Sequence, residues 1–171
     1  MTGVQTCALP IYLSASEKKT VEGLETQAVD DAQLYEDVVP ALSTLKTMGV
    51  KLVVASSLSN SAVAHFLEKS SIKELFSSVW TRENAGGVKA LPLARAIESG
   101  PFKADQVMCL VDTIDGLIVA KEVGANSILM INDYDEGRRL AMEAPTGGII
   151  SLHELPDAIR LIAENAKLSH W

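Results

Sequence analysis

The sequence lacks the features that mark several large classes of protein. Its longest apolar stretches fall far short of the ~20 residues that cross a bilayer, so no transmembrane helix is expected. Lys and Arg number 15 against 22 Asp and Glu, and no basic stripe is present, so binding to nucleic acid is not expected. Two cysteines in 171 residues make no disulfide framework, which favours a cytoplasmic location. No internal repeat is visible.

What is present fits an α/β protein. Hydrophobic residues make up 47% of the chain, which excludes wholesale disorder. Strands are predicted near residues 51–55, 79–80, 107–111, 127–131 and 148–150, and helices near 37–48, 60–69, 91–98, 116–123, 136–143 and 152–167. A capping box of Ser151 and Glu154 is expected to open the last helix. This alternation predicts a doubly wound parallel sheet covered on both faces. Ligands of such sheets bind beyond the carboxyl ends of the strands.

The N-terminal part differs from the rest. Residues 1–12 (MTGVQTCALPIY) have neither the pattern of a signal peptide nor a helical period. They resemble a translated sequencing-adapter read-through, with an ordinary disordered tail as the alternative. We therefore expect residues 1–13 to be an artefactual or disordered leader. Ser14 and Glu17 form a capping-box signal for an acidic helix that reaches about Gln33 and has few apolar residues.

Polar residues follow the strand at 51–55. Ser56, Ser57, Ser59 and Asn60 offer hydroxyls, an amide and the free N–H groups of a helix start, a combination that suits an anion. The alternative is that Ser57 or Ser59 simply caps the helix. The segment alone leaves both interpretations open.

Two carboxylates follow the strand at 107–111. Asp112 and Asp115 could bind Mg²⁺, which prefers hard oxygen ligands, or one of them could cap the next helix. Lys89, in Gly-Gly-Val-Lys, lacks the pattern of a nucleotide-binding phosphate loop. Cys109 lies inside a predicted strand and is expected to be a buried apolar residue rather than a nucleophile. The three histidines, His65, His153 and His170, show no metal-binding or catalytic-triad spacing.

Taken in order, these segments resemble the haloacid dehalogenase superfamily of hydrolases over about residues 14–168. The motifs are Lys-Leu-Val-Val-Ala-Ser at 51–56, Asn60, Lys-Ala-Leu-Pro at 89–92, and the run from Asp112 to Gly124 that includes Asp115. The resemblance implies that Ser56 holds the transferring phosphoryl group, Lys89 neutralises its charge, and Ser57 and Asn60 contact the substrate. It also implies that Asp112, with or without Asp115, binds Mg²⁺.

The implied activity is a Mg²⁺-dependent phosphatase or phosphomutase. Such an enzyme acts on a small phosphorylated metabolite through an aspartyl-phosphate intermediate. The sequence departs from the family pattern at Val111 and Gly116, where relatives often carry further acids. The largest departure is that no apolar strand followed by Asp-x-Asp precedes Ser56, so the family's nucleophile is missing.

The resemblance therefore implies an incomplete enzyme. Residues 14–36 are expected to be the remnant of a helical cap, and residues 37–171 an incomplete core. The family's strand order 3-2-1-4-5 implies that the missing first strand is the central one. By itself this chain is expected to be inactive. The alternative function is a non-enzymatic, receiver-like or regulatory domain, although a receiver would keep an acidic cluster at its first strand.

Overall fold

The computed structural model describes residues 14–88 and 90–168, and its elements follow the predicted alternation. The principal helices are α1 (Ala15–Asp31), α2 (Val38–Thr47), α3 (Asn60–Lys69), α4 (Arg82–Ala85), α5 (Leu91–Glu98), α6 (Ile114–Glu122), α7 (Tyr134–Leu140) and α8 (Leu155–Leu168). The strands are β1 (Leu52–Ala55), β2 (Phe76–Trp80), β3 (Met108–Val111), β4 (Asn126–Met130) and β5 (Gly147–Ile149). Single turns of 3-10 helix are η1 (Lys73–Leu75), η2 (Ala104–Gln106), η3 (Ala141–Glu143) and η4 (Leu152–Glu154). The short helix α4 was not predicted from the sequence.

The strands form two separate parallel sheets. β1 pairs with β2, and β3, β4 and β5 follow one another in a second sheet. Within residues 14–88 and 90–168, β1 has no strand partner other than β2, and β3 none other than β4. The expected parallel fold is confirmed. The order 3-2-1-4-5 without its first strand leaves two pairs of strands, whereas here β5 adds a third strand beside β4.

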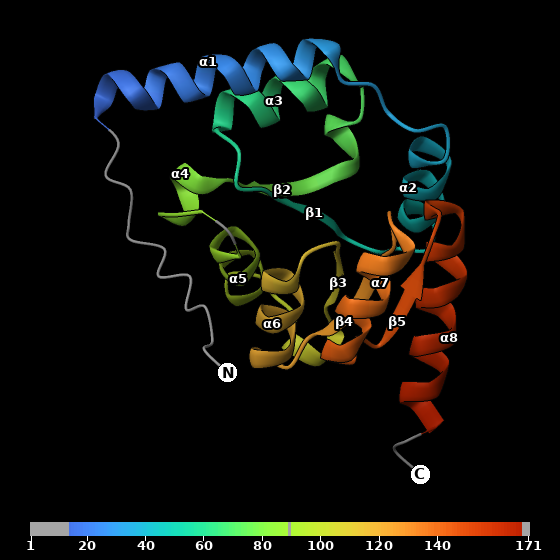
Figure 1. The fold of residues 1–171 in the computed structure, drawn as a ribbon. Helices are drawn as coiled ribbons and strands as arrows, with labels where there is room; N and C mark the ends of the chain where they lie inside the picture. The colour runs from blue at the N-terminus through green and yellow to red at the C-terminus, as the bar shows by residue number, and fades with distance from the viewer. Residues whose placement is uncertain (1–13, 89, 169–171) are drawn as a thin grey trace, which may run out of the picture.

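The three-stranded sheet is covered on both faces. Because successive side chains of a strand point to opposite faces, Ile128 and Leu129 of β4 enter different clusters. Ile128 packs with Leu45 of α2 and Leu155 of α8, whereas Leu129 packs with Leu117 of α6. Figure 1 shows α6 and α7 at one side of this sheet and α8 at the other. This half is doubly wound, as predicted.

The two-stranded sheet is less completely covered. Val54 of β1 packs beneath α3 with Val63 and Leu67, but the neighbouring Val53 is 43% exposed. Leu110 of β3 is likewise 40% exposed. The apolar sequences of β1 and β3 are typical of strands buried on both faces. Val53 and Leu110 are therefore more exposed than the sequences of their strands predict.

Local signals placed several helix ends. Ser14 and Glu17 form the predicted capping box of α1, and Ser151 and Glu154 form the one that opens η4 before α8. Gly49 ends the segment after α2 with a φ of +80°, a value that favours glycine. No helix in the described part of the chain combines the length and hydropathy needed to cross a membrane. The leader, residues 1–13, lies outside the described residues.

Candidate functional site

Ser56 lies at the carboxyl end of β1, beside the end of β2. Its backbone N–H donates to the carbonyl of Trp80 at 2.8 Å, which continues the β1–β2 ladder by one residue. Its Oγ accepts a hydrogen bond from the Leu58 N–H at 3.2 Å. Ser56 is half-buried and Ser57, the next residue, is exposed. The Ser56 hydroxyl therefore stabilises the turn that the chain makes after β1.

Asn60 joins this loop to the loop after β2. Its backbone N–H donates to the Glu83 carboxylate at 2.9 Å, and its side-chain oxygen accepts from the buried Thr81 hydroxyl. Ser59, which is fully buried, caps α3 by accepting from the Ala62 N–H at 3.3 Å. Of the two capping alternatives, Ser59 is the residue that caps the helix.

Carboxylates of the chain itself occupy the start of α3. Glu25 of α1 accepts from the Ser59 N–H at 3.1 Å and forms an ion pair with Arg82. Glu22 of α1 accepts from the Ser61 hydroxyl. Burial raises the pKa of Glu25, but the hydrogen bonds from Arg82 and Ser59 outweigh it and leave this pKa below its usual value. Sequence reasoning missed these contacts, because nothing local pairs residue 25 with residues 59 and 82.

The second predicted group follows β3. Asp112 and Asp115 are both exposed. Neither caps α6, since Thr113 is the N-cap and its Oγ1 accepts from the Gly116 N–H at 3.3 Å. The proposed helix-cap role for an aspartate is therefore wrong at this strand end. Thr113 could have been recognised as the cap, because threonine is also a favoured residue there.

Val111 and Gly116, the two departures from the family pattern near Asp112, lie against each other. A Cβ added to Gly116 would lie 2.9 Å from Val111 Cγ1. Separations this short require the neighbour to move, and Val111 has one stiff χ1. With Val111 in place, position 116 has no room for an acidic side chain.

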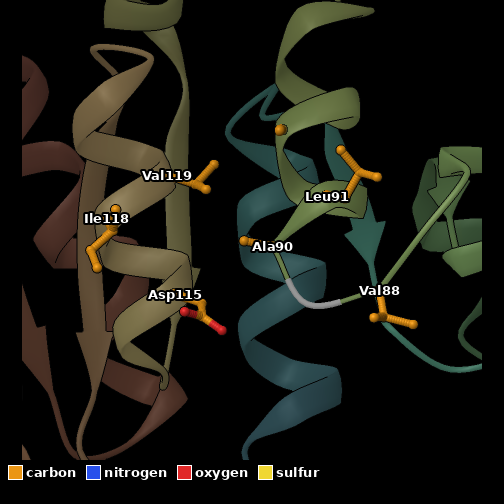
Figure 2. Close-up of a pocket in the computed structure, with 7 residues that line it drawn as sticks. Val88, Ala90, Leu91, Asp115, Ile118 and Val119 are labelled. Atoms are coloured by element: carbon orange, nitrogen blue, oxygen red, sulfur yellow. The ribbon is translucent and has the colours of Figure 1, made fainter. Parts of the chain in front are cut away.

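A shallow hollow of about 260 Å³ lies between the start of α5 and α6. Its lining is apolar except for Asp115, and consists of Val88, Ala90, Leu91, Ala94, Asp115, Ile118 and Val119. Figure 2 shows the Asp115 carboxylate extending from α6 toward the side on which Ala90 lies. Lys89 lies outside the described residues. Its two neighbours in sequence, Val88 and Ala90, share this hollow with Asp115.

The carboxylates of the described residues do not make a complete metal site. No group of three His, Cys, Asp or Glu side chains in residues 14–88 and 90–168 is arranged to hold a metal ion. Asp112 and Asp115 can each contribute a hard oxygen donor. Position 116, where Val111 leaves no room for a carboxylate, contributes no third donor.

The remaining reactive side chains lie elsewhere. Cys109 is buried in β3, and burial raises the pKa of its thiol to about 11, so it is not a poised nucleophile. His65 on α3 is hydrogen-bonded to Asp30 of α1 at 2.7 Å. His153 is exposed in η4, and His170 lies outside the described residues. The prediction that Cys109 is a buried strand residue is confirmed.

Comparisons with known proteins agree on one family. The family model described as haloacid dehalogenase-like hydrolase matches residues 9–130, a range that includes Ser56, Lys89, Asp112 and Asp115. No curated protein matches the sequence.

Solved structures of the same superfamily share the fold. A HAD phosphatase from Thermococcus onnurineus is 22% identical with a TM-score of 0.68, and the match covers 81% of this chain and 63% of that one. A predicted phosphoglycolate phosphatase from Haemophilus somnus is 18% identical with a TM-score of 0.70, covering 84% and 67%. A predicted phosphatase from Clostridium acetobutylicum is 22% identical with a TM-score of 0.70, covering 80% and 64%. The chain thus spans about two thirds of the length of these neighbours.

Proposed function

Because this chain belongs to the haloacid dehalogenase-like hydrolase family, we propose that Ser56, Lys89 and Asp112 belong to the phosphoryl-binding site of a phosphatase. The substrate is a small phosphorylated metabolite, and a phosphomutase is the related alternative. The observation that carries the proposal is the hollow that Asp115 shares with Val88 and Ala90. This hollow brings the residues on either side of position 89 next to α6, the helix that follows Asp112. Such an arrangement is expected if Lys89 and Asp112 belong to one site.

Each residue has one role in this proposal. The Ser56 hydroxyl donates to a phosphoryl oxygen while its oxygen keeps the hydrogen bond from Leu58 N–H. The Lys89 ammonium offsets the charge that develops on the phosphoryl group. Ser57 and Asn60 contact the rest of the substrate. Since Thr81 takes the side-chain oxygen of Asn60, the amide nitrogen is the atom that Asn60 offers, and it donates to an oxygen of the substrate.

Mg²⁺ would have Asp112 and Asp115 as its ligands. Among residues 14–88 and 90–168 no third acid completes a site with these two exposed carboxylates, so they fit the ion incompletely and we propose that this chain binds Mg²⁺ weakly. When bound, the ion supplies positive charge near the phosphoryl oxygens. The net charge of -7 and the free, buried thiol of Cys109 support a cytoplasmic enzyme without nucleic-acid partners.

We also propose that this chain does not itself turn over phosphate esters. Ser56 has no basic side chain hydrogen-bonded to it among the described residues, and the Cys109 thiol is buried. Asp112 and Asp115 serve the metal in this proposal. Binding groups without a nucleophile leave only a residual acceleration, orders of magnitude below that of a complete site.

The test is hydrolysis of p-nitrophenyl phosphate in millimolar Mg²⁺. The chain should show no turnover above background, whereas a chimera that adds an Asp-x-Asp first strand and cap from a structural neighbour should be active. In the chimera, Ser56→Ala and Lys89→Ala should each lower kcat/KM by about 10²–10³. Lys73→Ala, which removes an exposed lysine paired with Glu68, is the matched control and should have no effect. Equal Mg²⁺-dependent turnover by chain and chimera would contradict the proposal.

A further inference from the structure

Helix α1 has little apolar contact with the rest of the protein. Val29 is its buried residue, and its leucine, Leu24, is 62% exposed. An isolated helix of this length, 17 residues, is marginal in water even when its sequence favours helix. The contacts that keep α1 folded and docked on α3 must therefore be found among its polar groups. Figure 1 shows the two helices lying side by side.

Several polar contacts of α1 join its oxygen atoms to basic side chains of α3 and α4, in addition to the hydrogen bonds that Glu22 and Glu25 accept from Ser61 and Ser59. Residues 15–31 contain five Asp and Glu and two Lys. Glu25 pairs with Arg82 of α4, and both side chains are largely buried, at 14% and 20% exposure. Asp30 accepts from His65 of α3. The two contacts lie more than a helical turn apart along α1.

Lys69 of α3 is hydrogen-bonded to the C-terminal end of α1. Its ammonium donates to the carbonyls of Val29 at 2.8 Å, Asp30 at 2.5 Å and Ala32 at 2.9 Å. These carbonyls include groups that a helix end leaves without an intrahelical partner. The last turn of α1 has no basic residue of its own. Lys69 therefore supplies, from another helix, the positive charge that a helix C-terminus favours.

We propose that α1 is an arm held on the protein by charge, which can detach from α3 and α4 while the three-stranded sheet stays folded. Arg82 and Lys69 are its two cationic anchors, and Glu25 is the matching anion at the first of them. Detachment uncovers the Ser59 N–H in the loop that follows β1. It also leaves the Arg82 guanidinium, at the start of α4, with Glu83 as its remaining carboxylate partner. The arm thus controls access to this loop.

The experiment is hydrogen–deuterium exchange of the full chain, read by mass spectrometry. The readout is the peptide covering residues 15–31, with peptides covering β4 and α8 as the internal reference. Lys69→Ala should speed exchange of the α1 peptide by tenfold or more and leave the reference peptides unchanged. Lys73→Ala is the matched control, since it removes a lysine paired with Glu68 and not with α1. It should change α1 exchange by less than twofold.

Salt and Glu25→Gln test the electrostatic part. Raising NaCl from 0.05 M to 1 M shortens the screening length from about 14 Å to about 3 Å. It should therefore speed α1 exchange in the wild type and have a smaller effect in Lys69→Ala. Glu25→Gln should also speed α1 exchange, because the Arg82 guanidinium loses its buried partner. Unchanged α1 exchange in both variants and in 1 M salt would show that apolar contacts hold the helix. Simultaneous exchange of α1 and the reference peptides would show that α1 is no separate unit. Either result overturns the proposal.

Discussion

Truncation of Ile128 tests how well the larger half of this protein is packed. Ile128 of β4 is 0% exposed and packs with Leu45, Ile149 and Leu155, which come from both the sheet and the helices beneath it. With neighbours on every side the site cannot collapse easily, so Ile128→Ala should lower the free energy of unfolding by about 3 kcal/mol. Ile128→Val removes one methyl group and should lower it by about 1 kcal/mol.

Urea denaturation followed by far-UV circular dichroism measures both values. With an m-value of about 2 kcal/mol per M, Ile128→Ala should lower the midpoint by about 1.5 M. Ile150→Ala is the matched control, because Ile150 is 72% exposed and its truncation should cost less than about 0.5 kcal/mol. A loss below about 1 kcal/mol for Ile128→Ala would refute the reasoning. It would mean that the cluster is loosely packed, as in a molten state.

Three further predictions concern the edge strands, acid stability and the thiol. Among the described residues, β1 pairs with a strand on one side only, so the chain should self-associate at micromolar concentration through the other edge of β1. Val53→Lys should reduce this self-association, measured by sedimentation velocity, because a charge on an edge strand opposes pairing. Hydrogen bonds from the Ser151 hydroxyl and the Leu152 N–H lower the pKa of Asp37. The stability that Asp37 contributes is therefore present above pH ~4 and lost as pH falls through its folded pKa, so the stability advantage of wild type over Asp37→Asn should shrink there. With a pKa of about 11, Cys109 is about one part in a thousand thiolate at pH 8. In a Cys7→Ser variant, Cys109 is the one remaining cysteine. It should react with Ellman's reagent only after urea has unfolded the protein.

The order of elements could be predicted because each depends on nearby residues. Strands 107–111 and 127–131 were predicted from short apolar runs, and the start of α1 from Ser14 and Glu17, three residues apart. The residues of the candidate site were found in the same way, from the position of Ser56 and Asp112 directly after strands. Because no apolar strand with Asp-x-Asp precedes Ser56, the sequence also predicted that no strand would pair with both β1 and β3, and none does in the described part of the chain.

The surroundings of those residues depend on segments far apart in the chain. Glu25 and Arg82 are 57 positions apart, and no local pattern relates them. Lys69 caps a helix that ends 38 positions before it, and its role depends on how α1 crosses α3. Gly116 lacks room for a side chain because Val111 lies against it once α6 folds back on β3. Capping, turns and periodicity are local, so most of the helices and strands, though not α4, could be predicted along with the residues at their ends. Which charges meet depends on where packing brings distant helices together, and this could be learned from the tertiary structure alone.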